Sequence, residues 1–228
     1  MGGIECYIER SADLTDPLED PVKMSLLTET RRAKIQKYRA AEDRKRGFCA
    51  GLMITEHLRA HGRSPEEIRY TEHSRPYLLG LDFNISHSGE YVIMALSDAS
   101  VGCDIERIRP GKDSIAERFF SAAEVAWIRA AEDPVRSFTR IWTARESYVK
   151  YKGEGISLDF RQYEVQNAAV KGEPPQVKGD LSEVPYLGAA EIIREGIHQD
   201  CEVHQWLYAG EYVISLCADF SGEVDCIE

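Results

Sequence analysis

The chain has 228 residues, 43% of them hydrophobic and 29% charged, a composition typical of a globular protein and not of a disordered one. Its formal net charge of −11 argues against general nucleic-acid binding, because that function needs a basic surface. No apolar run is long enough to span a bilayer, and the first residues lack the basic and apolar regions of a signal peptide. The six cysteines form no Cys-x-x-Cys pair, so we expect reduced thiols in a cytoplasmic protein without structural zinc.

The first hundred residues predict one long helix followed by two strands. Residues Arg31–His61 have helical character, which Gly62 ends. Asp82–Ser86 and Glu90–Leu96 have the composition of strands, and we expect a turn of Ser-His-Ser-Gly between them.

The rest of the chain predicts a strand, two helices and a closing hairpin. Val101–Glu106 is a short strand, and Ser121-Ala-Ala-Glu124 is a capping box that begins a helix. Pro134 ends that helix and permits another through Lys152, closed by Gly153. A loop at 172–176 precedes the predicted hairpin strands Glu202–Leu207 and Glu211–Ala218.

Two five-residue segments occur twice in the same order. Arg39-Ala-Ala-Glu-Asp43 recurs 90 residues later, from Arg129, and Gly89-Glu-Tyr-Val-Ile93 recurs 121 residues later, from Gly210. Each copy places a helix before a strand of the Tyr-Val-Ile type. The sequence therefore predicts a pseudo-dimer of two similar α/β halves (α+β in class), residues 1–100 and 101–228. It is no solenoid, because such arrays repeat shorter units more often.

The two halves differ in their charged residues. The first offset places Ala60 opposite Lys150, although Glu56 stands opposite Glu146. The second places Asp225 opposite Asp104 but Ile227 opposite Glu106. Because each half lacks part of the set, we expect one composite site where the halves meet.

Two carboxylates lie two residues apart on the Val101–Glu106 strand. Asp104 and Glu106 would point to the same side. Adjacent carboxylates repel each other unless a cation lies between them, and oxygen ligands suit Mg²⁺. Taken alone, this short pattern more often marks the solvent-facing side of an edge strand.

A glutamate and a lysine lie one helical turn apart on the 134–152 helix. Glu146 and Lys150 share one face, whereas Ile141 and Tyr148 fall on the packed face. Taken alone, such a pair is more often an ordinary surface ion pair.

Anion-binding residues are predicted in the first half. The turn at Asn84–Gly89 offers the Ser86 hydroxyl and His87 as donors to a phosphate, although an ordinary polar turn has the same composition. The segment Arg31–Arg46 holds eight Lys and Arg against two acids, which suits a multiply charged anion or, alternatively, a basic helix face paired with acids elsewhere.

These motifs together resemble the surfactin-type (Sfp-like) 4′-phosphopantetheinyl transferases over nearly the whole chain. The family pattern joins a basic N-terminal helix, Lys-Pro, Asn-Ile-Ser-His-Ser, Gly-x-Asp-x-Glu, Arg-Phe-Phe-Ser-x-x-Glu and Trp-x-x-Lys-Glu-x-x-x-Lys. Here the basic segment begins at Arg31, and the five motifs after it begin at Arg75, Asn84, Gly102, Arg118 and Trp142 in turn. The resemblance implies the family's pseudo-dimer fold, with coenzyme A bound between the halves.

The resemblance also implies a reaction. The 4′-phosphopantetheine of coenzyme A, the substrate, moves to a serine of an apo acyl, peptidyl or aryl carrier protein, and 3′,5′-ADP leaves. The metal, Mg²⁺ or alternatively Mn²⁺, would be held by Asp104, Glu106 and Glu146. Glu146 would also be the base, directly or through water, and Lys150 would stabilise charge on the phosphoryl and leaving groups. The implied 3′-phosphate ligands are Arg31, Lys34, Arg46, Ser86 and His87, and Arg75 would line the adenine site.

Two departures and three alternatives remain. Arg145 and Arg75 replace the family's usual lysines, which keeps the charge but changes the donor geometry.

The carrier could serve fatty-acid synthesis or a peptide or polyketide pathway of secondary metabolism. A non-catalytic coenzyme A or nucleotide-binding module is disfavoured by the presence of every catalytic residue type. The third alternative is an interaction scaffold with an acidic surface. We expect a monomer that binds neither nucleic acid nor membrane.

Overall fold

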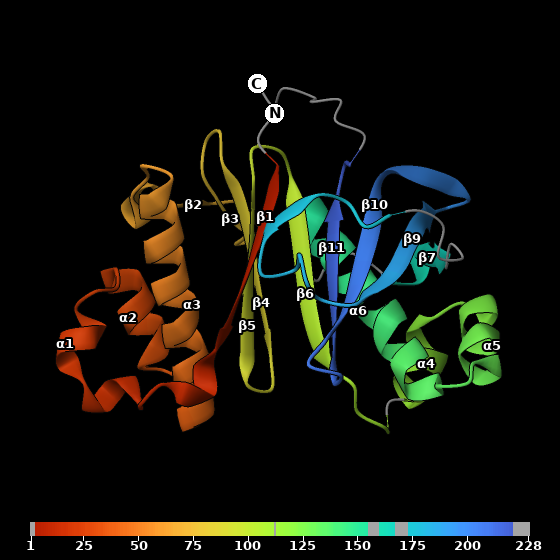
Figure 1. Ribbon diagram of the computed structural model, residues 1–228, viewed down its shortest axis with the longest axis horizontal. Coiled ribbons are helices and arrows are strands. Elements are labelled where there is room, and N and C mark those ends of the chain that lie inside the picture. The colour runs from red at the N-terminus through yellow and green to blue at the C-terminus, as the bar shows by residue number, and fades with distance from the viewer. Residues whose placement is uncertain (1–2, 112, 155–159, 167–172, 221–228) are drawn as a thin grey trace.

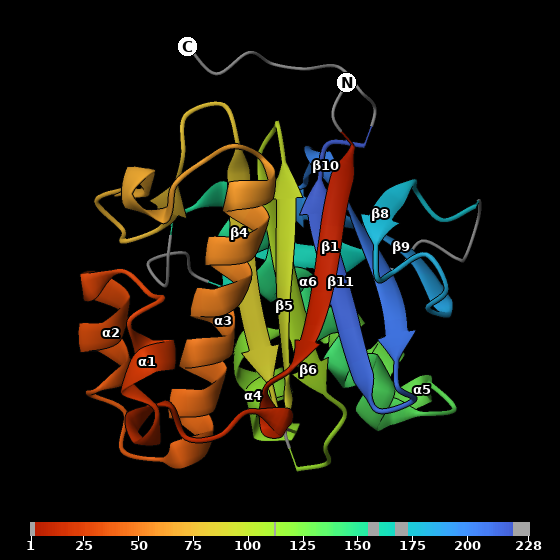
Figure 2. The same ribbon diagram turned by 60° about the vertical axis from the view of Figure 1, so that its left-hand side comes forward.

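The computed structural model describes residues 3–111, 113–154, 160–166 and 173–220, which form two central sheets flanked by helices (Figures 1 and 2). The strands are β1 (Ile4–Arg10), β2 (Arg69–Tyr70), β3 (Pro76–Tyr77), β4 (Asp82–Ser88), β5 (Tyr91–Ser97), β6 (Val101–Arg107), β7 (Tyr163–Gln166), β8 (Val177–Gly179), β9 (Tyr186–Arg194), β10 (Ile197–Tyr208) and β11 (Tyr212–Ala218). The α-helices are α1 (Pro21–Met24), α2 (Glu29–Ile35), α3 (Ala41–Ala60), α4 (Asp113–Phe119), α5 (Ala122–Ala130) and α6 (Pro134–Lys152).

The two large sheets share one apolar core. The first sheet has the order β4-β5-β1-β8 and the second has the order β6-β11-β10-β9-β7. Ile93 and Ala95 of the first sheet pack with Cys103 and Ile214 of the second. On the outer sides, α3 packs against the first sheet and α6 against the second, so the layers run α3, sheet, sheet, α6 (Figure 1).

The internal duplication is visible in the topology. The succession β1-α3-β4-β5 matches β6-α6-β10-β11, and the strands lie in the same order in their sheets. Arg10 pairs with Glu90, and Arg107 pairs with Glu211 in the same relation between neighbouring strands. The predicted α/β pseudo-dimer is therefore confirmed. We retain 1–100 and 101–228 as the proposed halves, although β8, from the second, extends the sheet of the first.

Several local predictions agree with the structure. Ser121 and Glu124 form the capping box at the start of α5. Helix α6 begins at Pro134 and ends at Gly153, which has a φ of 70°. β10 and β11 form the closing hairpin. The predicted loop at 172–176 is described from residue 173 onward, where it holds no helix or strand.

The predicted helix Arg31–His61 is wrong, because the chain breaks between α2 and α3. Two glycines of α3 lie where a side chain would collide with the preceding segment. A Cβ on Gly47 would lie 2.8 Å from the Tyr38 ring, and one on Gly51 would lie 2.9 Å from Leu27. Arg44 donates to the carbonyl oxygens of Tyr38 and Arg39 and so satisfies the broken end. Packing against these glycines overrides the helical propensity of the segment.

The predicted turn within Asn84–Gly89 is also wrong. The strand β4 continues through Ser88, and the turn begins only at Gly89, with a φ of 56°. Ser86 and Ser88 lie opposite Ile93 and Tyr91 of β5. Polar side chains are stable on this strand because each of its two faces has polar surroundings.

Side chains of β4 join the two halves along the free edge of β6. Asp82 accepts from the Val101 N–H at 3.0 Å, and Asn84 accepts from the Cys103 N–H at 3.3 Å. Ser88 accepts from the Arg107 N–H at 3.1 Å. We call this set the β4–β6 joint. Because side chains alternate along a strand, the intervening Phe83, Ile85 and His87 face the other way.

Helix α6 lies directly on β6 at Gly102. A Cβ at this position would lie 2.0 Å from the Ser147 carbonyl oxygen and 2.5 Å from the Tyr151 nitrogen. Only glycine permits this contact between two backbones. The contact brings the face of α6 that carries Glu146 and Lys150 toward the acids of β6.

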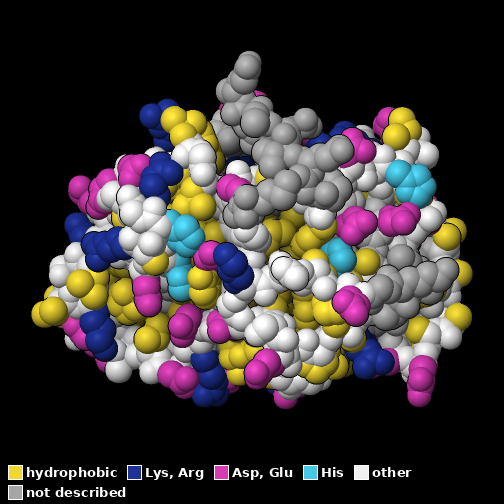
Figure 3. Space-filling view, turned by 45° about the horizontal axis from the view of Figure 1, so that its top comes forward, with side chains coloured by type: hydrophobic (Ala, Val, Ile, Leu, Met, Phe, Trp, Pro, Cys, Tyr) yellow, Lys and Arg dark blue, Asp and Glu magenta, His cyan; other side chains and the backbone are white. Residues whose placement is uncertain are grey.

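None of the helices described is long and apolar enough to cross a membrane. Figure 3 shows acidic and basic side chains interspersed over one face of the molecule. The net charge of −11 is therefore not collected into one patch on that face.

Gly102→Ala is expected to lower the free energy of unfolding by about 3 kcal/mol, because the methyl group must displace α6. Gly3→Ala is the control, since a Cβ at Gly3 meets nothing within 4 Å. Urea unfolding of both variants measures the difference. Equal stability of the two variants would show that α6 does not depend on this contact.

Candidate functional site

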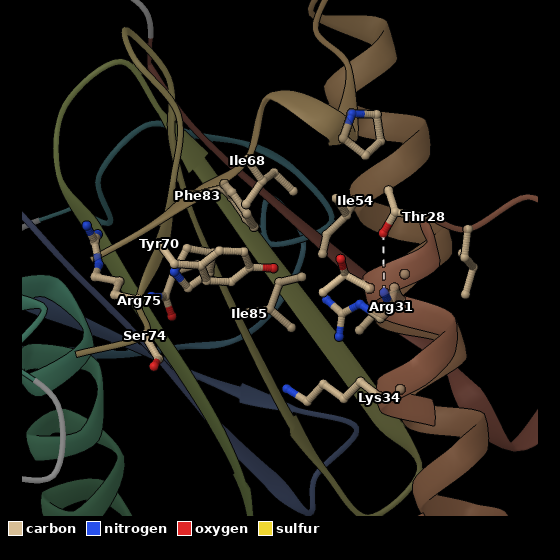
Figure 4. A pocket seen from close by; sticks show the side chains of 18 of the residues that line it. Thr28, Arg31, Lys34, Ile54, Ile68, Tyr70, Ser74, Arg75, Phe83 and Ile85 are labelled. Carbon is tan, nitrogen blue, oxygen red and sulfur yellow. Dashed lines mark hydrogen bonds between the residues drawn. The ribbon is translucent and has the colours of Figure 1, made fainter. Parts of the chain in front are cut away.

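A cavity of about 1020 Å³ opens between the helices of the first half and the end of α6. Side chains from α2, α3, β4, α6 and the 65–76 segment line it (Figure 4). Six of the predicted site residues are among its lining residues: Arg31, Lys34, Arg75, His87, Glu146 and Lys150. A volume of this size accommodates a nucleotide-sized ligand.

Two cations on α2 form one wall of the cavity. Burial lowers the pKa of Arg31, and burial together with the Arg31 charge lowers the pKa of Lys34. Within the described residues, neither side chain has a carboxylate partner. Arg31 is partly buried and Lys34 is exposed beside it, and adjacent cations without acids form a favourable site for an anion. Thr28 fixes the start of α2 by accepting from the Arg31 N–H, as Figure 4 shows.

His87 lies on the same cavity, on the face of β4 opposite the joint. Burial and then the charge of Arg46 lower the pKa of His87 below its ordinary value. The imidazole is therefore largely neutral at pH 7 and can donate a hydrogen bond. Arg46 itself donates to the Gly89 carbonyl oxygen at 2.8 Å and pairs with Asp43.

Lys150 and Asp104 form the centre of a polar cluster at the other side. The Lys150 ammonium lies 2.7 Å from Asp104 Oδ1, 2.9 Å from Ser86 Oγ and 3.2 Å from the Cys103 carbonyl oxygen. Ser86 also donates to Asp104 Oδ1 at 2.6 Å. Burial alone would lower the pKa of Lys150, but the Asp104 carboxylate raises it above the ordinary value. The lysine is therefore held in its charged form.

Glu146 faces the cavity one helical turn before Lys150. Burial, and then the charge of Asp104, raise the pKa of Glu146 to about 7, and Glu106 adds to this shift. Ser88 donates to Glu106 at 3.0 Å. The three carboxylates thus lie near enough to repel one another, and Glu146 can exchange a proton near neutral pH.

The structure separates the remaining predicted residues from the cavity surface. Ser86, Asp104 and Glu106 lie in the polar cluster behind Lys150, and Arg46 lies beside the β4–β5 turn. No group of three His, Cys, Asp or Glu side chains in the described residues already has a metal-binding arrangement.

Sequence reasoning missed most of the uncharged lining. Tyr70, Ser74, Ile54, Ile68 and Ile85 contribute to the cavity, and Figure 4 shows them between Arg75 and the α2 wall. Apolar residues of this kind give no signal in a single sequence, because they look like ordinary core. The small residues Gly47 and Gly51 also line it and were detectable only as unexplained glycines inside a helix.

Arg145 takes part in a fully buried ion pair. It is 0% exposed, pairs with Glu124 of α5, and lies against the rings of Phe120 and Tyr163. Glu124 also accepts from the Ser121 and Val165 N–H groups. The residue before Glu146 therefore connects α6 to α5 and β7 and does not line the cavity.

Two family models match consecutive parts of the chain. The family model described as "4'-phosphopantetheinyl transferase superfamily" matches residues 100–217, and that described as "4'-phosphopantetheinyl transferase, N-terminal" matches residues 19–99. The chain belongs to the 4′-phosphopantetheinyl transferase superfamily.

The similar proteins are bacterial transferases. A 4'-phosphopantetheinyl transferase of Bacillus subtilis is 28% identical over 218 residues, 92% of this chain and 90% of that protein. The transferase Sfp of Bacillus subtilis strain 168 is 30% identical over 151 residues, 63% of this chain and 67% of that protein. AcpT of Salmonella typhimurium strain LT2 is 39% identical over 118 residues, 48% of this chain and 60% of that protein. The chain is thus an Sfp-like 4′-phosphopantetheinyl transferase.

Glu124→Gln in this transferase is expected to lower the free energy of unfolding by about 3–5 kcal/mol, because the Arg145 charge would stay buried without its partner. Glu117→Gln removes the same charge from the exposed pair with Arg129 and should change stability little. Denaturant unfolding compares the two variants. Similar losses in both would contradict a special role for the buried pair.

Proposed function

We propose that this transferase moves the 4′-phosphopantetheine group of coenzyme A to a serine of an apo carrier protein in a Mg²⁺-dependent reaction, releasing 3′,5′-ADP. One observation carries the proposal. A single cavity is lined both by the acid-free cations Arg31 and Lys34 and by the Glu146/Lys150 pair. A long substrate with separate phosphate groups needs both kinds of site within one cavity.

The carboxylates fit a divalent metal ion. Asp104 Oδ2 is buried without a hydrogen-bond partner, while its other oxygen binds Lys150 and Ser86. A buried carboxylate oxygen without a partner is costly, and the pKa of the neighbouring Glu146 is raised by burial and then by the charge of Asp104. Asp104, Glu106 and Glu146 would hold Mg²⁺, or Mn²⁺ with the same oxygen donors. When bound, the ion would offset the charge of the pyrophosphate.

The chain's own residues would carry the proton and the charge. The serine oxygen attacks the phosphorus next to pantetheine, and the bond to the leaving phosphate oxygen breaks. Glu146 would take the serine proton, directly or through water, since its pKa of about 7 suits a base near neutral pH. Lys150 would place its positive charge against the transferring phosphoryl and leaving groups.

The opposite wall would bind the 3′-phosphate. Arg31 and Lys34 would supply positive charge and His87 a neutral donor, with Arg46 of α3 beside His87 and Ser86 on the other face of β4 in support. Arg75 lies near Tyr70 and Ser74, where the adenine would lie by the family resemblance.

The deciding experiment mixes the protein with coenzyme A, Mg²⁺ and apo carriers of the acyl, peptidyl and aryl classes, and weighs each carrier by mass spectrometry. A gain of one phosphopantetheine on any carrier supports the proposal, and the relative rates identify the carrier class. No gain on any of them would leave a coenzyme A-binding protein without transferase activity.

Glu146→Gln is expected to lower kcat about 100-fold or more with the fold intact, because the base and a metal ligand are lost together. Glu56→Gln is the matched control, since Glu56 is exposed on α3 at the position that corresponds to Glu146. Steady-state transfer rates and circular dichroism test both variants. Full activity of Glu146→Gln would remove this residue from the chemistry.

His87→Ala should weaken the binding of coenzyme A about tenfold while leaving that of 3′-dephospho-coenzyme A nearly unchanged, as expected for the loss of one hydrogen bond to a charged phosphate. Isothermal titration of the two ligands measures both affinities. Equal losses would remove His87 from the 3′-phosphate site.

A further inference from the structure

Arg75 forms bonds to three separate elements of the fold. Its Nε donates to the Lys150 carbonyl oxygen at 3.1 Å, at the end of α6. Its Nη2 donates to Asp82 of β4 and lies 3.4 Å from the Val101 carbonyl oxygen at the start of β6. The side chain therefore connects both halves of the molecule at the point where α6 ends.

The surrounding backbone is arranged to hold Arg75 in place. Thr71 accepts from the Arg75 N–H through its hydroxyl at 3.1 Å and donates its own N–H to the Arg75 carbonyl oxygen at 2.9 Å. Gly153, with a φ of 70°, leaves room for the side chain, because a Cβ there would lie 2.7 Å from Arg75 Cδ. Both the loop before Arg75 and the cap of α6 thus accommodate this one side chain.

Asp82 is the carboxylate partner of Arg75, and its burial is energetically unfavourable. One of its oxygens accepts from both Arg75 and the Val101 N–H, and the other is buried without a hydrogen-bond partner. Burial raises the pKa of Asp82 even though Arg75 opposes this shift. A carboxylate kept in such surroundings indicates that its contact with Arg75 has a use beyond stability.

Arg75 is placed poorly to bind the 3′-phosphate. Figure 4 shows it across the cavity from Arg31 and Lys34, beyond Tyr70, with its guanidinium pointing away from those cations. Two of its three guanidinium nitrogens already donate to protein groups, and the Asp82 carboxylate offsets its charge.

We infer that Arg75 and Asp82 form a latch that positions Lys150 by holding the last turn of α6 to β4 and β6, and that Arg75 is a positioning residue and not a phosphate ligand. The inference rests on the proposed function for its catalytic consequence. The latch requires the planar guanidinium of arginine, because its Nε and Nη2 bond to separate partners. A lysine ammonium cannot make both bonds with the same geometry. The family's usual lysine at this position would therefore be a poor substitute in this chain.

The experiment compares Arg75→Lys, Asp82→Asn and the double variant in transfer assays with coenzyme A and with 3′-dephospho-coenzyme A. We expect kcat to fall about tenfold in each single variant, equally with both donors, because a misplaced Lys150 affects the reacting phosphate and not the 3′-phosphate. The double variant should be no worse than the singles, since all three break one latch. Lys34→Gln provides the contrast, with a raised KM for coenzyme A only.

Arg63→Lys is the matched control for the substitution itself. Arg63 also binds a carboxylate, Glu67, and a carbonyl oxygen, that of Leu79, but it does not line the cavity. Its kcat should equal that of the wild type. A raised KM for coenzyme A but not for the dephospho form in Arg75→Lys would make Arg75 a phosphate ligand and overturn the inference.

A second measurement keeps the latch testable without activity. Amide hydrogen exchange of the last turn of α6 should be faster in Arg75→Lys and Asp82→Asn than in the wild type and Arg63→Lys. Unchanged exchange would overturn the latch. If the wild type transfers no phosphopantetheine, the proposed function fails, and the exchange result still decides whether the latch exists.

Discussion

The site depends on the β4–β6 joint, in which side chains of one half close the free strand edge of the other. An edge strand buried between two halves needs partners for its N–H groups, since each one left unpaired costs about 1–3 kcal/mol. Asp82, Asn84 and Ser88 supply these partners. Because the joint uses one side of β4, the other side is left to line the cavity with Ile85 and His87. One strand thus fixes the halves and forms part of the site between them.

The catalytic pairing follows from this joint and from the contact at Gly102. The joint fixes β6 beside β4, and the glycine lets α6 lie on β6, so that Lys150 reaches both Asp104 of its own half and Ser86 of the other. The roles proposed for Glu146 and Lys150 therefore require both halves together. The duplication accounts for this arrangement: each half keeps the same succession of strand, long helix and hairpin, and the charged residues where the halves meet differ between them.

The sequence predicts correctly those structural features that depend only on residues close together along the chain. The capping box at Ser121, the glycine end of α6 and the alternation of Asp104 with Glu106 each depend on neighbours along the chain, and the structure agrees with each prediction. The α2–α3 break depends on tertiary packing at Gly47 and Gly51, and the polar β4 strand depends on a partner strand. Neither effect is visible locally. The repeat predicts the wrong counterpart for β6 in one respect, because Asp225, which it places opposite Asp104, lies beyond the described residues. Strand pairing instead makes β1 the counterpart of β6: Glu9 lies opposite Val92, as Glu106 lies opposite Val213.

The two ends of the site differ in charge: α2 holds the cations Arg31 and Lys34, whereas the end of α6 holds the carboxylate Glu146 and Lys150 beside Asp104. The pKa values of Arg31 and Lys34 are lowered mainly by burial, and that of Glu146 is raised by burial and by its acidic neighbours. In each case the charged form lacks full compensation from the protein. A ligand with an anionic group at one end and a cation-bound pyrophosphate at the other would relieve both deficits at once, but only in one orientation. The electrostatics of the site would therefore also set the direction in which coenzyme A binds, because a reversed ligand would leave the α2 cations uncompensated.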